Sequence, residues 1–540
     1  MRAHRLRSCF CILPVVLAAC GAPGSGESTV PAGGSVGQGG DRTASGGGPS
    51  TTGGSAGAGG TSQSSIAGAP ASGGASTTSN GGARFFSGGA TSQGGAAATG
   101  GVSLQGGASV AGSASGGTSS GGTTSQGGKA SGGSGGKGEL LAFPGAQGFG
   151  RLAVGARGKD VYHVSNLNDS GAGSLRDAIS QANRTVVFDV GGVIQISSRL
   201  VFKSNQTIAG QTAPGGGITI YGDGTSFSAA SNTIIRYVRF RMGKIGESEK
   251  DTVTMANGHD VIFDHCSLSW GRDGTFDLNQ ESGATLYNIT LQDSIVSQGL
   301  QTHSTGGLVN TTGTSIIRSL YIDNNSRNPK ARGTLQFVNN VIYNWVVSGY
   351  ILGDTSGRSD GYMVGNYLIT GPETKGGTLD SPTPEYHLYA AGNYYDSDND
   401  GALNGRLLGK GDFGSVTWET TPSATFPALP ELTAPEALEH VRSHAGASRW
   451  RDPVDDYVVD ELMSFGKKGK TISDETSLGI PGVVGNLAGG TTPKDTDQDG
   501  MPDAWEQANA LDANNSADRN GDRNGDGWTN LEEYINSLAQ

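Results

Sequence analysis

The chain has 540 residues, 93 of them glycine, and a formal net charge of −12. The negative charge argues against nucleic acid as a partner, because binding to phosphates needs a surplus of cationic side chains. It is compatible with an acidic substrate if cations mediate the contact. Composition changes sharply along the chain, and the part able to fold, about 400 residues, suffices for one large domain and one small one.

The first residues are typical of a targeting segment. Arg2, Arg5 and Arg7 precede an apolar run that is too short to span a membrane as a mature helix. The run ends in Leu-Ala-Ala-Cys-Gly, which resembles a bacterial lipoprotein cleavage box. The resemblance implies a signal peptide over residues 1–19, a lipidated Cys20, and an extracytoplasmic protein that is anchored at the bacterial outer membrane or cell surface, or secreted. An ordinary secretory signal with a chance cysteine is the alternative.

Residues 20–138 consist almost entirely of Gly, Ser, Thr and Ala. Such a segment buries too little apolar area to offset the entropy lost on ordering, so we expect a disordered linker. As a flexible coil it would have an end-to-end distance of roughly 60 Å. Beyond it Cys266 is the one remaining cysteine, so no disulfide is expected in the folded part.

One short pattern recurs between residues 233 and 396: an apolar strand with a small polar or amide residue near its middle. A repeat of about 20–30 residues with one strand per period marks a solenoid, and such apolar strands suit parallel stacking. A β-sandwich fits less well, because its turns come about every 8–12 residues. We therefore predict a parallel β-helix in which the recurring asparagines exchange amide hydrogen bonds from coil to coil. The residues aligned in one column are Val238, Cys266, Ser294, Leu320, Asn340, Asn366 and Asn393.

Two helical patterns flank the repeat. The first covers residues 174–183. A solenoid end needs a cover, so we expect this helix to cap one end. The second pattern, residues 434–442, lies after the coils.

The segment 260–277 places several acids on and after an apolar strand. Unpaired buried charge is expensive, so a carboxylate cluster in such a place needs a partner. A bound cation would supply one, and it points to an enzyme that acts on an acidic polymer. Asp264 and His265 lie within the core-like strand itself, and we interpret them as a structural pair that hydrogen-bonds between coils.

Five motifs, in the same order along the chain, resemble those of the pectate lyases of polysaccharide lyase family 1. They are residues 143–150, 168–177, 263–265, 325–333 and 445–455. The resemblance implies an all-β fold, a right-handed parallel β-helix, for a pectate lyase domain over residues 139–470. That fold agrees with the repeat.

The resemblance also implies a calcium site. Carried over residue by residue, its ligands are Glu249, Asp251, Asp273 and Asp277. Carboxylate oxygens suit Ca²⁺. In a straight strand Asp273 and Asp277 would stand roughly 13 Å apart, so they share one ion only if the chain bends at Gly274; otherwise they serve two ions. Solvated surface acids are the alternative.

The family's catalytic pair is an arginine followed five residues later by a second one, here Arg327 and Arg332. By resemblance, Arg327 takes the C5 proton of a uronate and Arg332 holds a substrate carboxylate in bidentate fashion. Many members carry a substrate-binding lysine on the coil after the calcium acids, but residues 301–308 contain none. His303 is the nearest candidate there, with a structural hydrogen-bonding role as the alternative.

Two acidic loops near the C-terminus have the spacing of EF-hand loops. Each runs into a short amphipathic stretch, residues 504–511 and 530–538. They resemble dockerin-type calcium modules, so we expect a small α-helical, calcium-binding module over residues 495–540, joined by a linker over residues 471–494. Such a module either binds a protein partner or stabilises the C-terminus; a disordered acidic tail is the alternative. The expected ligands are Asp495, Asp497, Asp499, Asp503 and Glu506 in the first loop and Asp522, Asn524, Asp526, Asn530 and Glu533 in the second.

The resulting prediction is a surface-tethered pectate lyase. It would cleave α-1,4-polygalacturonate, an acidic plant polysaccharide, by calcium-assisted β-elimination to 4,5-unsaturated oligogalacturonides. A galacturonan hydrolase is one alternative; that chemistry needs two or three clustered acids and neither calcium nor arginine. A non-catalytic, cell-surface polysaccharide-binding β-helix is the other.

Overall fold

A computed structural model describes the protein over residues 139–353 and 357–539, which belong to one compact unit. The predicted signal peptide over residues 1–19, the lipidated Cys20 and the linker over residues 20–138 lie outside the described residues. Among the described residues, no helix is long and apolar enough to cross a bilayer.

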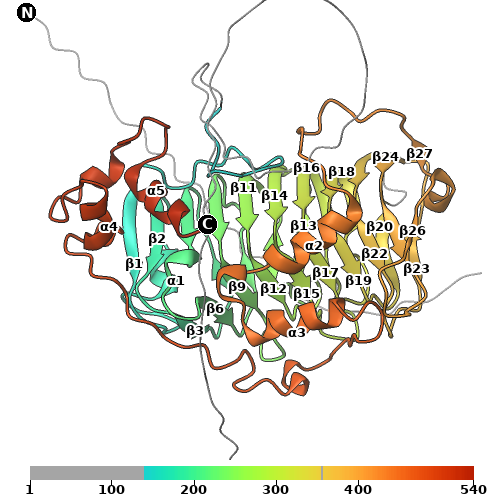
Figure 1. Ribbon diagram of the computed structural model, residues 1–540, viewed down its shortest axis with the longest axis horizontal. Coiled ribbons are helices and arrows are strands. Elements are labelled where there is room, and N and C mark those ends of the chain that lie inside the picture. The colour runs from blue at the N-terminus through green and yellow to red at the C-terminus, as the bar shows by residue number, and fades with distance from the viewer. Residues whose placement is uncertain (1–138, 354–356, 540) are drawn as a thin grey trace, which may run out of the picture. The chain divides into compact units, whose positions relative to one another are not determined.

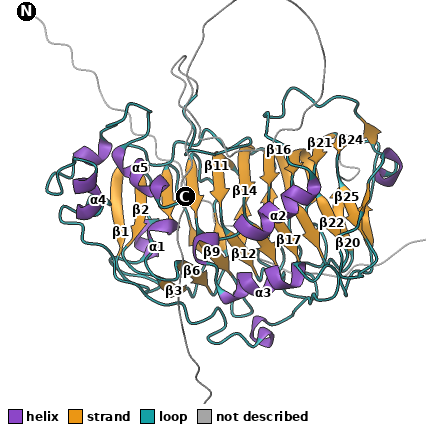
Figure 2. Ribbon diagram, viewed as in Figure 1, coloured by secondary structure: helices purple, strands orange, loops and turns teal. Residues whose placement is uncertain are grey.

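The strands stack coil upon coil and form three faces (Figures 1 and 2). Within each face, strands of successive coils pair in parallel, apart from one antiparallel strand at the end of the third face. The first and second faces join because β16 and β18 each run through both. The prediction of a parallel β-helix is therefore confirmed. The first face consists of β4 (Leu200–Val201), β7 (Thr225–Ser226), β10 (Val253–Met255), β13 (Phe276–Asn279), the starts of β16 (Leu308–Ile317) and β18 (Lys330–Val338), β20 (Ser348–Leu352) and β23 (Gly377–Asp380).

The second and third faces complete each coil. One antiparallel strand, β26 (Arg406–Leu407), closes the third face against β25 (Tyr394–Asp396). The second face consists of β1 (Asp160–Val164), β2 (Arg184–Phe188), β5 (Gln206–Ala209), β8 (Thr233–Arg236), β11 (Gly258–Asp264), β14 (Leu286–Gln292), the ends of β16 and β18, β21 (Ser359–Val364), β24 (Tyr386–Ala391) and β27 (Thr417–Trp418). The remaining strands of the third face are β3 (Gly192–Gln195), β6 (Ile218–Tyr221), β9 (Val238–Arg241), β12 (Ser267–Ser269), β15 (Ile295–Ser297), β17 (Leu320–Ile322), β19 (Val341–Tyr343) and β22 (Tyr367–Ile369).

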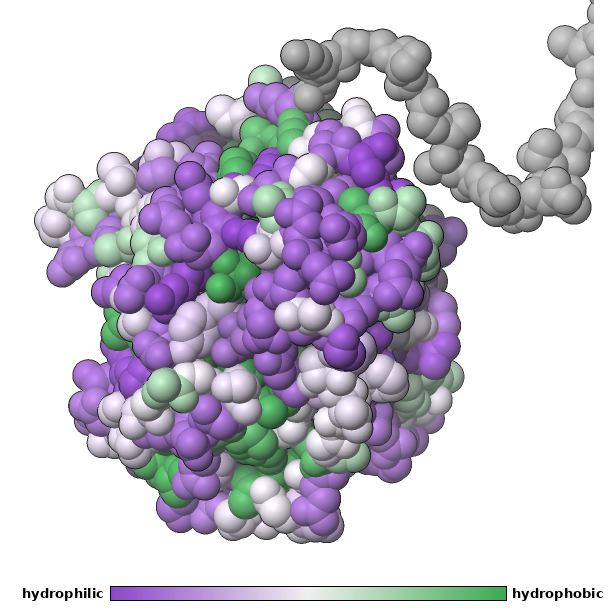
Figure 3. All heavy atoms as spheres, turned by 90° about the vertical axis from the view of Figure 1, so that its left-hand side faces the viewer, coloured by the Kyte–Doolittle hydropathy of each residue, from purple (hydrophilic) through white to green (hydrophobic). Residues whose placement is uncertain are grey.

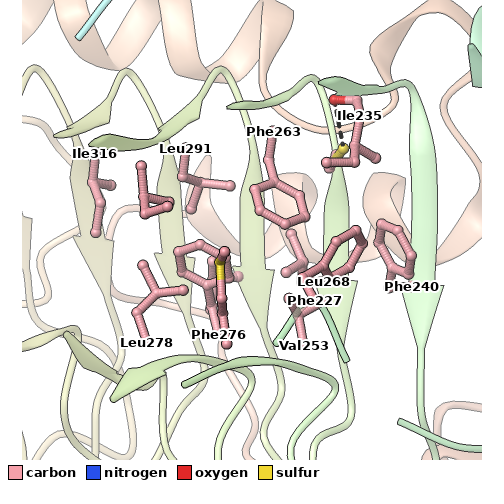
Figure 4. Packing of buried hydrophobic residues seen from close by; sticks show 14 of the residues in the cluster. Phe227, Ile235, Phe240, Val253, Phe263, Leu268, Phe276, Leu278, Leu291 and Ile316 are labelled. Atoms are coloured by element: carbon pink, nitrogen blue, oxygen red, sulfur yellow. Dashed lines mark hydrogen bonds between the residues drawn. The ribbon is translucent and has the colours of Figure 1, made fainter. Parts of the chain in front are cut away.

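Apolar side chains fill the interior of the coils (Figure 4). Phe202 and Phe227 stack with ring centroids 4.1 Å apart, and Phe227 meets Phe263 edge to face at 4.9 Å. Phe263 continues the series to Phe276 at 5.5 Å. Full burial of each such ring stabilises the fold by about 1.5–3 kcal/mol, so contacts between successive coils hold the solenoid together.

A column of hydrogen-bonded polar residues runs along the interior beside the third face. Asn340 donates to Asn366 over 3.2 Å and Asn366 to Asn393 over 2.8 Å, which confirms the predicted amide ladder. Serines continue it toward earlier coils. The prediction was wrong at one position: Ser319, not Leu320, stands in the column, where its backbone N–H donates to Asn340. Leu320 faces the other way and packs under a covering helix.

The helix expected over residues 174–183 is much shorter. The α1 helix spans only Leu175–Ala178, with Ser174 as its N-cap. It ends early because the carbonyls of Ile179 and Gln181 accept hydrogen bonds from the Gln206 side chain, and Asn183 turns left-handed at a φ of 65°. Its buried Leu175 does join the core at the first coil, as a cap would.

Helices α2 (Ala434–His444) and α3 (Pro453–Leu462) cover the third face. The first was predicted; the second was not, and only its first turn overlaps the family motif at residues 445–455. Arg241, fully buried on β9, donates to Asp452 at 2.7 Å and to Asp455 at 2.9 Å, which fixes the start of α3 on the coil. Short 3-10 helices cover Gly210–Thr212, Lys410–Phe413, Ser448–Trp450, Glu475–Leu478 and Asp518–Asn520.

The C-terminal segment contains α4 (Asp503–Ala508) and α5 (Asn530–Ser537), where the two amphipathic stretches were predicted. The expected linker before it is not free, because Ile472 and Val484 are buried against Trp270. Figure 3 views the molecule from the end that carries α4 and α5, and this end is predominantly hydrophilic.

Candidate active site

The first face presents alternate residues of its strands to solvent. On β13, Phe276 and Leu278 point inward, so Asp277 and Asn279 point outward. The register puts Asp277 beside Thr254 of the preceding coil, and Asn279 in one column with Asn310 and Arg332.

Asp251 and Asp277 converge on Gly274. Asp251 lies just before β10 and accepts the Gly274 N–H at 2.8 Å, while Asp277 accepts the Leu308 N–H at 3.0 Å. A Cβ atom on Gly274 would come within 2.9 Å of one Asp251 oxygen and 3.3 Å of one Asp277 oxygen. A side chain at this position would therefore intrude between the two carboxylates.

The electrostatics of this pair suit a cation. Burial raises the pKa of Asp251 to about 6, and the charge of Asp273 adds to the shift. Burial raises the pKa of Asp277 to about 7, with repulsion from Asp251, while Arg327 opposes the rise. The negative charge of the pair thus exceeds what nearby cationic side chains compensate. Because the donors are carboxylate oxygens, the residues fit Ca²⁺.

Asp273 lies at the edge of the pair. The chain bends at Arg272, Asp273 and Thr275, while Gly274 forms a parallel bridge with Thr305, so the separation expected for a straight strand does not apply. The Asp273 side chain is 45% exposed, and one of its carboxylate oxygens lies 2.8 Å from Nδ1 of His303. His303 therefore contacts a predicted calcium ligand directly.

Glu249 takes a different position from the other predicted ligands. It is exposed, with a φ of 59°, and lines a hollow together with Arg272 and His303. The groups that shift the pKa values of Asp251 and Asp277 do not include it. The structure therefore places Glu249 at the rim of the site.

The two predicted catalytic arginines flank the acids from later coils. Arg327 lies near enough to lower the pKa of Asp277, and its carbonyl accepts the Gly307 N–H at 2.9 Å. Arg332 is on the outward side of β18, where β18 alternates between half-buried and buried residues. Lys330 shares that side, in register with Leu308, and sequence reasoning missed it. The sequence did contain an indication of it, because Lys330 lies two residues before Arg332 within the family motif at residues 325–333.

Asp264 has the structural role that was predicted. It is fully buried, and it accepts hydrogen bonds from Arg236 of the preceding coil at 2.7 Å and from Gln292 of the next coil at 2.8 Å. His265 stacks on Tyr237 at 4.7 Å. These groups tie the second face together away from Asp251 and Asp277.

The acids of the C-terminal loops form three tight groups, within each of which the carboxylate oxygens lie within 4.8 Å of one another. Asp518, which the loop spacing did not predict, takes part in the second group. The groups are Asp495, Asp497 and Asp499; Asp499, Glu506 and Asp518; and Asp522, Asp526 and Glu533.

Two expected ligands of these loops are engaged elsewhere. Asp503 accepts hydrogen bonds from Thr496 and Lys494 at 2.7 Å each. Asn530 donates to the Asp518 carbonyl and accepts the Arg523 N–H. Asn524 stays beside its loop's acids, donating to Asp526 at 2.9 Å.

Comparison with known proteins identifies the family. The chain is 50% identical over 405 residues to the probable pectate lyase C of Aspergillus flavus, which covers 74% of this chain and 94% of that protein. The chain belongs to the pectate lyase family. It is a polysaccharide lyase. Another family member, pectate lyase 2 of Ambrosia artemisiifolia, is 31% identical over 241 residues, which is 39% of this chain and 58% of that protein.

Solved pectate lyase structures and a pollen protein share a weaker similarity. The cedar pollen allergen jun a 1 matches with 16% identity and a TM-score of 0.41, over 55% of this chain and 92% of that one. The thermostable pectate lyase PL 47 matches with 14% identity and a TM-score of 0.43, over 57% and 98%. No protein-family model matches the chain.

Proposed function

We propose that this pectate lyase cleaves polygalacturonate by calcium-assisted β-elimination, giving 4,5-unsaturated oligogalacturonides. The observation that carries the proposal is the half-buried pair Asp251 and Asp277, whose excess negative charge lies beside Arg327. A hydrolase would need an acid and a base among its carboxylates, whereas this site combines acids with an arginine.

The proposed chemistry divides between the acids and the arginines. Asp251, Asp277 and Asp273 would hold Ca²⁺, which when bound supplies positive charge beside the uronate carboxylate and so makes the C5 proton more acidic. Arg327 then takes that proton. The arginine side chain can accept a proton only as the neutral guanidine, a form that nearby positive charge favours. The electrons of the C5–H bond form the C4–C5 double bond, the C4–O bond breaks, and the leaving oxygen is protonated by water.

The outward side of the first face would bind the rest of the polymer. Arg332 suits bidentate contact with a uronate carboxylate. Lys330 stands in register with Leu308, on the coils that follow Asp277, and we assign it the lysine role that residues 301–308 leave open. His303 instead contacts Asp273, so we assign it to positioning that acid.

The test is incubation with polygalacturonate, with and without calcium, while the ultraviolet absorbance of the unsaturated product is followed. We expect calcium-dependent absorbance that Arg327→Ala abolishes with the fold intact. Arg358→Ala is the matched control, because Arg358 is an exposed arginine paired with Asp360 on the second face. Absorbance that persists in chelator, or in Arg327→Ala, would disprove the mechanism.

The same assay separates the alternatives. Release of reducing ends without absorbance would indicate a galacturonan hydrolase. Binding to the polymer with neither signal would indicate a polysaccharide-binding β-helix.

Two further proposals concern the ends of the chain. We propose that Cys20 is lipidated and anchors the enzyme at the cell surface; incorporation of labelled fatty acid should be lost in Cys20→Ser, and unchanged labelling would disprove it. We also propose that the dockerin-like acidic loops bind calcium. Burial, with repulsion from neighbouring acids, raises the pKa of Asp499 to about 7 and that of Glu506 to about 8. A bound cation would compensate the negative charge of these acids.

A further inference from the structure

The first acidic loop contains buried carboxylates that lack donors. Asp499 and Glu506 are both 0% exposed. One oxygen of Asp499, both of Glu506, both of Asp497 and one of Asp518 receive no hydrogen bond from the described residues. Buried charge without a partner is strongly unfavourable. The arrangement of these oxygens therefore requires a cation with a preference for oxygen, and Ca²⁺ is the common one.

Asp518 completes this group from outside the twelve-residue loop. Its carboxylate comes within 4.8 Å of those of Asp499 and Glu506. Asp503, the ligand that the spacing predicts, is instead held by Thr496 and Lys494. An ion at this place would therefore join the first loop to the segment that precedes the second loop.

The same loop rests directly on the solenoid. Met501, fully buried, packs with Ala209 of β5 and with α5. A Cβ atom on Gly500 would lie 3.2 Å from Val161 of β1. His163 of β1 lies 3.2 Å from the Gln498 carbonyl and 3.8 Å from the Asp495 carboxylate.

Further contacts extend this docking to the segment that precedes β1. Glu532 of α5 forms an ion pair with Arg157 at 2.9 Å, and the Trp528 indole donates to the Leu141 carbonyl at 3.1 Å. The end of a solenoid must be covered to stay soluble and folded. Here the C-terminal segment covers part of the second face where the coils begin (Figure 1).

We propose that a calcium ion held by Asp495, Asp497, Asp499, Glu506 and Asp518 clamps the C-terminal segment onto the first coils of the solenoid. The conformation that gathers the carboxylates is the one that docks Met501, so ion binding and docking stabilise each other. This inference rests on the proposal that the acidic loops bind calcium. It assigns the module an internal, stabilising role in place of a protein partner.

Ion binding is tested in the full chain carrying Asp251→Asn, Asp277→Asn, Asp522→Asn and Asp526→Asn, which removes the active-site acids and two acids of the second loop. Terbium luminescence excited through Trp505, the neighbour of Glu506, reports occupancy, and calcium displaces terbium. Asp518→Asn should weaken calcium binding about tenfold or more, because a charged ligand is lost. Asp503→Asn is the matched control and should change it little. Equal effects of both variants, or no effect of Asp518→Asn, would overturn the assigned ligand set.

The clamp is tested in the same background by thermal unfolding and limited proteolysis. Calcium should raise the Tm and protect the 479–494 segment from cleavage, and Asp518→Asn should reduce both effects at equal calcium. Calcium binding without a change in Tm or protection would overturn the clamp while leaving the ion site. Elimination by the chain with intact active-site acids at saturating calcium is measured separately, so failure of the clamp and failure of the lyase mechanism are distinguishable.

Discussion

Arg241→Met tests how the covering helices are held on the solenoid. Arg241 is fully buried and donates to both oxygens of Asp452, to Asp455 at 2.9 Å, and to Ser269 at 2.7 Å. Methionine fills similar space but removes the cation that pairs with Asp452 and Asp455, which are both fully buried. Arg239 remains, at 3.6 Å from Asp452. Removing one partner of such a buried pair costs about 3–5 kcal/mol.

The expected change in Tm follows from the size of the fold. For about 400 residues the unfolding entropy is about 0.8 kcal/mol/K, so a loss of about 4 kcal/mol lowers the Tm by about 5 °C. Scanning calorimetry measures the shift. Arg442→Met is the matched control, because Arg442 pairs with Glu439 on the exposed side of α2 and should change the Tm by less than about 1 °C. A shift for Arg241→Met as small as that of the control would refute the reasoning.

Four further outcomes are expected. Asp277→Asn should raise the calcium concentration for half-maximal elimination about tenfold or more; an unchanged titration would exclude Asp277 as a ligand. Because the pKa of Asp251 lies at about 6 and that of Asp277 at about 7, protons compete with calcium below those values, so the half-maximal calcium concentration should rise as pH falls from 8 to 5. Lys330→Ala should raise KM for polygalacturonate more than it lowers kcat, in steady-state kinetics; the reverse pattern would exclude a binding role. Asn366→Ala should lower the stability by about 3 kcal/mol in urea unfolding, because it leaves the buried N–H of Asn340 without its acceptor.

The asparagine ladder shows how far spacing alone can predict this fold. Regular steps between Asn340, Asn366 and Asn393 sufficed, because each asparagine occupies the same place in its coil. The prediction slipped by one residue at Leu320, where the next coil is shorter and both Ser319 and Leu320 fit the pattern. In an extended chain a slip of one residue exchanges the two faces. Only the packing of Leu320 under the covering helices distinguishes them.

The candidate site divides in the same way. Asp251, Asp277 and Arg327 were found from motifs, and the structure brings them together. Asp518 could not be found, because it lies outside the loop pattern and meets Asp499 only through the fold of the intervening chain. The ion pairs of Arg241 could not be predicted either, because a single arginine on an apolar strand does not indicate which acids will pair with it.

Turn length and coil spacing are independent in this solenoid. Neighbouring positions of the ladder are 28 residues apart between Cys266 and Ser294, but 21 apart between Ser319 and Asn340. Both pairs nevertheless stand one strand spacing apart, about 4.8 Å along the axis. A polymer lying along the first face would therefore meet new side chains at a constant interval, whatever the length of the turns beside it. Insertions in those turns can change which sugars are admitted without altering the interval at which the chain is read.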